Sequence, residues 1–520
     1  MSSARRADPV GSAPIQILQH PPLQGYRLLL LTVALPLATF MQVLDTTIAN
    51  VAVPTLAGQL GSSSIQGTWV ITSYVVASAI VLPITGWLAR RFGEVRLFLW
   101  STGLFVCASF LCGMATSLGM LVAFRVLQGA VAGPMLPLAQ TLLLNNYPPA
   151  KRNMAIALWS MTVSVAPIFG PVVGGWISDN YYWGWIFFIN VPVGILVVAL
   201  VWWLLRGRES AVKRQPLNVV GLALLILGIG ALQMMLDRGK GLDWFNSPEI
   251  IALAVIAVVA LAFLVAWELT DANPIIDLRL FASRNFSIGV ICISLGMMLF
   301  LGTVVLLPLL LQTQYGYTAT LAGLAAAPIG ILPILLAPLI GKYALRLIDL
   351  RVLISIGFLV FAACMYTRTW FSPDMDMHFV MIPQFAQGLA NALFFTPLIA
   401  LAFSGLKPEK MANAASLFNS VRTLFGAIGT SLAMTLWERR EAVHHARLSE
   451  HVNEYSPLTR DSLQSLQALG LDASQSAAYL AGEITRQSFI LSANDIYWLC
   501  AIGFSALIAL VWLARPAARG

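Results

Sequence analysis

The sequence predicts an all-α polytopic membrane protein, and three observations lead to this fold class. Of its 520 residues 58% are hydrophobic and 10% are charged, whereas about a quarter of the residues in an ordinary soluble chain are charged. The mean hydropathy is +0.80. Apolar segments long enough to span a bilayer, which takes about 20 residues, recur along the whole chain. A soluble fold would leave these segments facing water and is excluded.

Fourteen apolar segments are predicted to be membrane helices. The run that starts at residue 28 is too long for the apolar region of a signal peptide, so it is predicted to stay as the first helix. Most connections between the segments are short. The predicted helices cover 28–52, 67–89, 97–115, 119–143, 154–177, 185–205, 217–236, 249–268, 287–311, 320–341, 352–370, 379–403, 413–437 and 491–514.

The basic residues predict the orientation of the helices. With the N-terminus inside, most of the 31 Lys and Arg residues fall in cytoplasmic segments, as the positive-inside rule requires. Both termini are therefore predicted to be cytoplasmic. This distribution also explains the net charge of +8 without a nucleic-acid partner. Eight of the other basic residues fall on the outer side, five of them in one long segment, and Arg125 and Arg422 lie inside predicted helices.

An internal repeat divides the chain into two related parts. A shift of 259 residues aligns Gln128 and Gly129 with Gln387 and Gly388. Two six-helix halves with two inserted central helices are therefore predicted, a layout typical of transporters. The predicted domains are an N-terminal tail (1–26), an N-terminal half (27–205), a linker with the inserted helices (206–284), a C-terminal half (285–514) and a C-terminal tail (515–520).

The segment 438–490 is the only long connection and is predicted to lie outside the membrane on the outer side. It mixes charges of both signs with regularly spaced Leu and Ala residues, a pattern that indicates short amphipathic helices. Two interpretations stay open for this segment. It could be a docking surface for a partner protein, or it could be a solvated cap.

Asp45 is an acidic residue inside the first predicted membrane helix, where an acid is unexpected. A carboxylate at a helix centre costs about 2.5 to 3.5 kcal/mol on insertion scales. Burial favours its protonated form and a nearby Arg favours its ionised form, so Asp45 is predicted to bind and release a proton. At a shift of 254 residues, which aligns Pro54 with Pro308, its repeat partner is Leu299, so the repeated scaffold does not require an acid here. The alternative is a permanent salt bridge that only fixes a helix.

Two arginines are the other deep charges. Arg125 is the expected partner of Asp45, and because Arg does not deprotonate it would hold or release the carboxylate. Its repeat partner, Gln384, is uncharged, and the alternative role is a static tie between helices. Arg422 has no obvious acidic partner. It could meet anionic groups of a substrate, or it could reach backbone carbonyls.

The stretch "APIFGPVVGGW" (166–176) is predicted to break and bend the fifth helix. Pro171 and Pro167 remove backbone hydrogen bonds, and Gly170, Gly174 and Gly175 let another helix approach closely. This combination suits a gate between the two halves. A kinked packing helix is the alternative.

A substrate cavity is predicted between the halves. Met and aromatic side chains suit a pliable apolar cavity that accepts varied ligands, although each of them could equally contact lipid or the core. The predicted lining residues are Met297, Met298, Gln387, Asn391, Phe394, Phe395 and Arg422.

No enzymatic or ATP-binding motif is present in the sequence. The stretch "DRGKGLDW" (237–244) lacks the flanking residues of a phosphate-binding loop. The five Cys residues have no metal-ligand spacing. The chain is therefore predicted not to be an enzyme and to use neither cofactor nor metal, so an ion gradient or the substrate gradient would supply its energy.

Five stretches together resemble one known family. They are "LDTTIANVAVP" (44–54), "GWLARRFGEVR" (86–96), "RVLQGAVAGP" (125–134), "APIFGPVVGGW" (166–176) and "WGWIFFINVPVG" (183–194). They resemble the fourteen-helix drug:proton antiporter branch of the major facilitator superfamily, and the resemblance runs through nearly the whole chain.

The resemblance implies a proton-driven exporter of hydrophobic drugs in the bacterial inner membrane. It implies that Asp45 is the proton site, that Arg125, Gln128 and Gly129 act in proton coupling, and that Gly170, Pro171, Gly174 and Gly175 form the antiporter motif. It also implies two protein partners, a periplasmic adaptor and an outer-membrane channel, beside hydrophobic substrates, protons and membrane lipid.

The motif between the second and third helices departs from the superfamily pattern. Gly86, Gly93 and Arg96 match the pattern. Arg90 stands where the superfamily usually has an acid, and Glu94 stands where a basic residue is common. A modified cytoplasmic latch is the expectation that follows.

Two other functions compete with multidrug export. The chain could be an exporter or facilitator of one native metabolite or siderophore, which would predict a narrow substrate range. It could also be a receptor or scaffold that transports nothing. The deep charges and the proline- and glycine-rich fifth helix argue against this last hypothesis.

Overall fold

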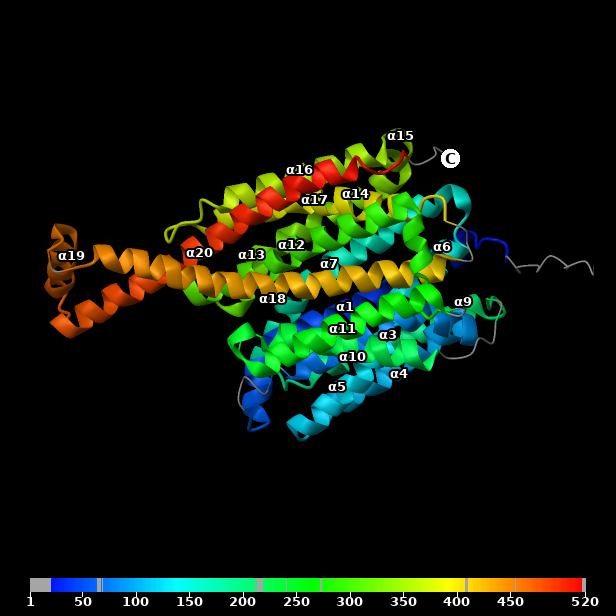
Figure 1. Cartoon of the computed structure of the whole chain (residues 1–520), viewed down its shortest axis with the longest axis horizontal. Coiled ribbons are helices and arrows are strands. Elements are labelled where there is room, and N and C mark those ends of the chain that lie inside the picture. Colours follow the sequence, from blue (N-terminus) through cyan, green and yellow to red (C-terminus); the bar gives the residue numbers. More distant parts are fainter. Residues whose placement is uncertain are drawn as a thin grey trace, which may run out of the picture.

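The computed structural model describes residues 20–62, 67, 69–210, 212, 218–239, 241–271, 274–406, 410–453 and 455–516. Within these residues every regular element is a helix, and 12 helices are long and apolar enough to cross a membrane. Figure 1 shows the long helices running side by side along the longest axis of the molecule. The prediction of an all-α membrane protein is confirmed, while the number of fourteen spanning helices stays a prediction.

The helices form because lipid offers the backbone no hydrogen-bond partners, so each apolar segment must pair its own N–H and C=O groups. The helices before the predicted linker are α1 (Gly25–Gln59), α3 (Trp69–Phe92), α4 (Glu94–Gly113), α5 (Leu118–Ala132), α6 (Met135–Asn146), α7 (Arg152–Asn180), α8 (Trp185–Phe188) and α9 (Asn190–Leu205). Two further helices, α10 (Val219–Arg238) and α11 (Pro248–Thr270), follow them.

The rest of the chain adds a second set of helices. These are α12 (Arg284–Gln314), α13 (Ala319–Ala326), α14 (Ile331–Leu339), α15 (Leu345–Leu347), α16 (Leu350–Arg368), α17 (Met377–Phe403), α18 (Met411–His451), α19 (Pro457–Ala468) and α20 (Ala473–Val511). Short 3-10 or π turns at 149–151, 244–246, 278–282, 327–330 and 340–344 connect or extend them. The predicted fifth and thirteenth spans fall in α7 and α18.

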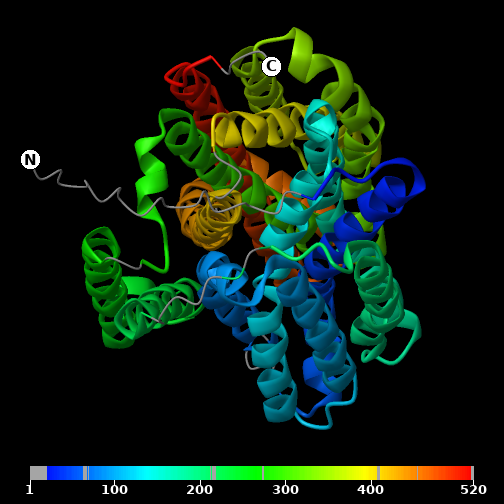
Figure 2. The same ribbon diagram turned by 90° about the vertical axis from the view of Figure 1, so that its right-hand side faces the viewer.

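The helices differ strongly in the share of their residues that is buried inside the bundle. In the most apolar stretch of α17, 72% of the residues are buried, against 22% in α11. In the pair α10–α11 at the flank of the bundle, α10 contacts α3 and α18, and a small apolar cluster around Leu225 and Ile229 joins the pair to α3. Figure 2 shows this pair, in green, at the edge of the end-on view. The central helices are therefore the ones that can build a site.

The segment 438–490 is mostly continuous helix rather than a loop. α18 extends to His451, α19 follows, and α20 begins at Ala473, so the three project together beyond the bundle (Figure 1). Asp495 of α20 bonds to Arg440 and His444 of α18, at 2.5 and 2.7 Å. The expectation of short amphipathic helices is met by α19, but the rest of the segment continues the long helices α18 and α20. Hydropathy shows where lipid ends but not where a helix ends.

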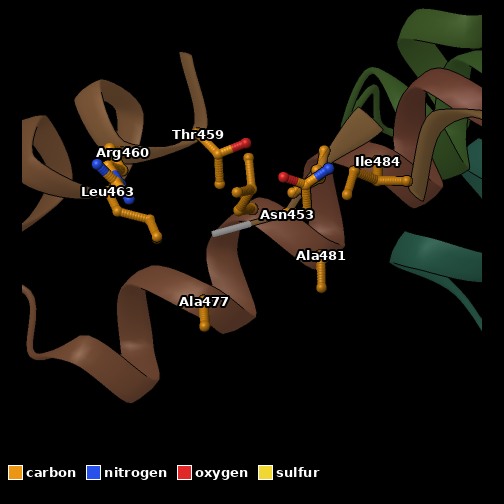
Figure 3. Close-up of a pocket in the computed structure, with 9 residues that line it drawn as sticks. Asn453, Thr459, Arg460, Leu463, Ala477, Ala481 and Ile484 are labelled. Atoms are coloured by element: carbon orange, nitrogen blue, oxygen red, sulfur yellow. The ribbon is translucent and has the colours of Figure 1, made fainter. Parts of the chain in front are cut away.

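A hollow lies in this projecting part of the molecule. It has a volume of about 490 Å³ and lies between the end of α18, α19 and the first turns of α20. Figure 3 shows Leu463, Ala477 and Ile484 among the residues that line it. The hollow lies well away from the buried charges described below.

Candidate functional site

Asp45 lies on α1, fully buried, and three donors converge on its carboxylate. The Arg125 Nη1 atom of α5 donates to Oδ2 at 2.6 Å. The Gln128 Nε2 atom donates to Oδ1 at 3.1 Å, and the Asn190 Nδ2 atom of α9 donates to the same oxygen at 2.7 Å. Helices far apart in the sequence thus meet on one acidic group. Three donors suit an ionised carboxylate, which accepts hydrogen bonds at both oxygens.

Arg125 is equally buried and is held on several sides. Its Nε donates to the Val70 carbonyl of α3 at 3.0 Å, and Nη1 also donates to Gln128 Oε1 at 2.7 Å. The guanidinium lies over the Tyr74 ring, 4.2 Å from its centroid, and 5.5 Å from that of Phe187. Nη2 has no hydrogen-bond partner. The guanidinium is thus held by α3 and α5 as well as by Asp45.

A serine on α4 completes the network. The Ser109 Oγ atom accepts from Gln128 Nε2 at 2.7 Å and from Asn190 Nδ2 at 3.0 Å. Each of these amide nitrogens therefore divides its two hydrogens between Ser109 and Asp45. A change at the Asp45 carboxylate reaches α1, α4, α5 and α9 through these bonds.

The motif glycines bring helices together around this network. A Cβ atom at Gly129 of α5 would lie 2.9 Å from the Tyr74 Cα of α3. A Cβ atom at Gly174 of α7 would lie 2.8 Å from the Ile48 side chain, and one at Gly170 would overlap Thr47. Thr47 and Ile48 follow Asp45 closely on α1, so the close α1–α7 contact, where Gly175 is also buried, fixes the turn that carries the acid.

α7 runs without interruption from Arg152 to Asn180, so the prediction that it is broken at 166–176 is wrong. A proline removes one backbone bond, and neighbouring bonds hold the helix in lipid. The side chains of Pro167 and Pro171 lie outside the described residues. The role of this segment as a gate stays a prediction.

The modified motif between α3 and α4 makes contacts at the other end of these helices. Glu209, which follows α9, accepts from the backbone N–H groups of Val95 and Arg96 at 3.0 and 2.9 Å. It caps the start of α4 beside Gly93, whose φ is +94°. The Arg96 Nε atom lies 3.9 Å from the same carboxylate. The Glu209 carboxylate thus supplies negative charge at a helix N-terminus, where it is favourable.

Arg90 and Gly86 contact the second set of helices instead. Arg90 Nη1 donates to Asn413 Oδ1 at the start of α18, and a Cβ atom at Gly86 would overlap the same Asn413 side chain. Glu94 accepts from Asn145 at 3.2 Å. The unusual Arg90 therefore joins α3 to α18 through a neutral acceptor.

The predicted cavity residues are mostly packed in the core. Phe394 and Phe395 are buried and meet Phe358, Phe361 and Phe300 edge to face or tilted. Asn391, Met297 and Arg422 are also buried, and Met298 is half-buried with its backbone against α18. Their role in lining a substrate cavity stays a prediction.

A third buried arginine escaped the sequence analysis. Arg368 at the end of α16 is 1% exposed, and its Nη2 donates to Gln384 Oε1 at 2.7 Å and to Gln387 Oε1. Gln384 and Gln387 are the repeat partners of Arg125 and Gln128. In the second set of helices, glutamines of α17 thus also bind a guanidinium. This guanidinium comes from the neighbouring helix α16, whereas Arg125 and Gln128 are both on α5.

Comparison with known proteins places the chain in a family. Residues 35–430 match the sequence model of the Major Facilitator Superfamily. The chain belongs to this superfamily. Its members are transporters, so the chain is not an enzyme, and the resemblance found in the sequence motifs is confirmed at this level.

Several relatives match over nearly their full length. The chain is 59% identical to the multidrug export protein EmrB of Haemophilus influenzae, over 96% of this chain and 98% of the relative. It is 58% identical to EmrB of Escherichia coli strain K12, over 96% and 97%. It is 52% identical to the fatty acid resistance protein FarB of Neisseria gonorrhoeae, over 96% and 98%.

Solved structures share the fold at low sequence identity. The proton:xylose symporter XylE matches with a TM-score of 0.58 and 14% identity, over 94% of this chain and 95% of that one. The human organic anion transporter MFSD10 matches with a TM-score of 0.58 and 12% identity, over 94% and 100%. The major facilitator fold of this chain is therefore established.

Proposed function

We propose that this chain is a proton-coupled antiporter of the bacterial inner membrane that exports hydrophobic drugs and other toxic compounds. The high identity to the EmrB multidrug export proteins supports the drug-export part of this function. The convergence of Arg125, Gln128 and Asn190 on buried Asp45 supports the proton-coupling part. An acidic group deep in a membrane protein is expensive to keep and marks a proton or substrate pathway.

In this mechanism a proton replaces Arg125 as the positively charged partner of the Asp45 carboxylate. A proton on Oδ2 would remove the negative charge that strengthens the bond of 2.6 Å from Arg125 Nη1, so this bond is weakened and can be released. Asp45 then becomes neutral and Arg125 keeps its charge. Release of this bond removes the charged link between α1 and α5 and leaves only the neutral bond from Gln128, which favours the movement that a change of access between the two membrane faces needs. Gln128 and Asn190 can remain bonded to Ser109 during the exchange.

The proposed topology has fourteen spanning helices with both termini in the cytoplasm. α7 and α18 are the two spans added to the twelve that hydropathy identifies. The pairing of helices supports two related halves, because α1 packs on α7 as α12 packs on α18, and α4 packs on α5 as α16 packs on α17. The peripheral pair α10–α11 would be the insertion between them.

The bonds of Arg90 support a modified cytoplasmic latch. Arg90 joins α3 to Asn413 on α18, and Ser416 of α18 donates to the Leu82 and Pro83 carbonyls of α3 at 2.7 and 3.0 Å. These bonds hold the two proposed halves together at their cytoplasmic ends. Opening toward the cytoplasm would have to break them.

The proposed partners are a periplasmic adaptor of the EmrA type and an outer-membrane channel of the TolC type. The resemblance to EmrB supports these partners. The projecting helices α18–α20 provide the surface that would reach them, and Tyr455, Leu458 and Leu469 there are each about four-fifths exposed or more. Apolar side chains exposed together on a part that leaves the membrane are typical of an interaction surface.

A narrower transporter is the second candidate function. The similarity to FarB, which is named for fatty acid resistance, favours an exporter of one class of native metabolite. The two functions differ in range, because a multidrug exporter transports structurally unrelated dyes and drugs. Transport of three unrelated lipophilic compounds by the purified protein would support the first function over the second.

Asp45→Asn is expected to abolish transport driven by a pH gradient. Purified protein in liposomes would be given a pH gradient, and accumulation of a lipophilic cationic dye would be followed. The native protein is expected to accumulate the dye, and the variant to behave like empty liposomes, because Asn cannot carry a proton. Asp461→Asn, which removes an exposed acid from α19, is the matched control. Uphill transport by Asp45→Asn at the native rate would refute proton coupling through Asp45.

A further inference from the structure

Three arginines gather where α1 begins and α9 ends. Arg27 is in the first turn of α1, while Arg206 and Arg208 come just after the last residue of α9. Among the described residues, none of the three forms an ion pair with an acidic side chain. Glu209, the next acid in the chain, is engaged at the start of α4 instead. This end of the two helices thus carries positive charge without an acidic partner.

Aromatic rings hold two of these guanidiniums at the surface. The Arg27 guanidinium lies 5.8 Å from the centroid of the Trp203 ring. The Arg206 guanidinium lies 5.3 Å from that of Trp202, and both arginines are exposed. A ring attracts the cation through its face but leaves the N–H groups unused. Neither guanidinium donates a hydrogen bond to any part of the chain that the structure describes, so these donors can serve a ligand.

Arg208 brings a third charge close to Arg27. Its Nη1 donates to the Pro21 carbonyl at 2.9 Å and to Asn146 Oδ1 at 3.1 Å, and both acceptors are neutral. Partial burial and the nearby charge of Arg27 lower the pKa of Arg208. Like charges held this close repel each other, so an anion placed among them is favourable.

The second set of helices closes the corresponding position with its own acceptors. α12 packs on α20 as α1 packs on α9. Arg284 at the start of α12 donates to the Leu513 carbonyl just beyond α20, at 2.6 Å. Arg351 lies 5.0 Å from the centroid of the Trp512 ring, but it also bonds to Asp349 at 2.8 Å. Arginine beside tryptophan is thus satisfied within the protein there and is left open at α1 and α9.

Exposed apolar side chains continue from the arginines along both helices. Leu29 and Val33 are each more than half exposed and lie on the face of α1 that starts with Tyr26. Leu196, on the same face of α9 as Trp203, is 52% exposed. Both helices are long and apolar enough to cross a membrane, and Trp, Tyr and Arg at the end of such a helix mark the level of the lipid headgroups. A ligand here meets charge at one end and apolar surface along the rest.

We propose that this end of α1 and α9 binds an anionic phospholipid, whose phosphate contacts Arg27 and Arg206 and whose acyl chains lie along the exposed apolar side chains. A guanidinium matches the oxygens of a phosphate through paired hydrogen bonds. Basic clusters between spanning helices are typical headgroup sites on the cytoplasmic side, where the proposed topology puts this end. A free phosphate would satisfy the arginines but leave the apolar side chains uncovered.

The lipid site and the proton site share two helices. α1 carries Asp45 and α9 carries Asn190, and these two side chains bond at 2.7 Å. A headgroup held by Arg27 and Arg206 would join the same helices at another level. The lipid site goes beyond the proposed export function and does not depend on proton coupling.

The test compares two lipids that share their acyl chains and differ in charge. Native mass spectrometry of the full-length protein, delipidated in detergent, would measure binding of phosphatidylglycerol and of phosphatidylcholine. The native protein is expected to bind phosphatidylglycerol more tightly. Arg27→Gln combined with Arg206→Gln is expected to weaken phosphatidylglycerol binding about tenfold or more, the loss expected for two arginines near an anionic headgroup, and to leave phosphatidylcholine binding unchanged.

Two further double variants make the outcome specific. Arg284→Gln combined with Arg351→Gln removes the same charge from the corresponding end of the second set of helices. This matched control is expected to bind phosphatidylglycerol as the native protein does. Arg27→Lys combined with Arg206→Lys keeps both charges and is expected to retain most of the preference for phosphatidylglycerol.

Three results would overturn the proposal. The first is an unchanged preference for phosphatidylglycerol in Arg27→Gln combined with Arg206→Gln. The second is an equal loss in the control variant, which would show that net charge and not this cluster attracts the lipid. The third is complete competition by inorganic phosphate, which would make this a site for soluble phosphates. Binding is measured without a pH gradient or a drug, so failure of the lipid site leaves the export function standing, and the reverse also holds.

Discussion

Arg125→Ala is expected to destabilise the folded protein by about 3–5 kcal/mol at pH 8, the cost of breaking a buried ion pair. The variant leaves the Asp45 carboxylate buried without its counter-charge, with only the two amide donors. Unfolding in mixed micelles with increasing SDS measures the effect.

The double variant provides the control for this prediction. Adding Asp45→Asn to Arg125→Ala removes the unpaired charge, so most of the lost stability is expected to return. A double variant that is no more stable than Arg125→Ala would contradict the account. The stability of the fold would then depend on the contacts of Arg125 with Tyr74 and Val70, and not on the ion pair.

Gly429→Ala is the second substitution with a large expected effect. A Cβ atom at Gly429 of α18 would lie 2.6 Å from the Met298 Cα atom of α12. The obstacle is backbone, which cannot rotate away, so the two helices must separate. Overpacking of this kind costs about 1–3 kcal/mol, and more where a backbone must shift. Thermal unfolding of the purified protein and its yield in the membrane measure the effect.

A second glycine gives the matched comparison. Gly103 lies in the membrane helix α4, and an added Cβ atom would meet no atom within 4 Å. Gly103→Ala is expected to be neutral or slightly stabilising, because Ala is the better helix former. Equal melting temperatures for Gly429→Ala and the native protein would show that α12 and α18 are not held in backbone contact.

The ion pair of the candidate site could be predicted from the sequence because charges in lipid are few. Asp45 and Arg125 stand out in apolar helices, and opposite charges there must find each other. Gln128 came from the family resemblance, not from chemistry. Ser109 and Asn190 were missed, because neutral polar residues in membrane helices also serve ordinary packing and carry no distinct signal.

The errors in the fold have physical causes too. Arg368 lies near the end of its predicted helix (352–370), where a basic residue is unremarkable, and the two glutamines that bury it come from another helix. The lengths of α18 and α20 were underestimated, because polar residues continue a helix in water as readily as apolar ones do in lipid. In α7 the surrounding backbone bonds outweighed the prolines.

The claim that Asp45 carries the proton is tested most directly by proton release on substrate binding. A lipophilic cationic substrate would be added to weakly buffered, purified protein at a series of pH values, and the protons released would be followed with an indicator dye. The account predicts release from the native protein wherever Asp45 is partly protonated, and none from Asp45→Asn that still binds the substrate. Equal proton release by Asp45→Asn and the native protein would contradict it.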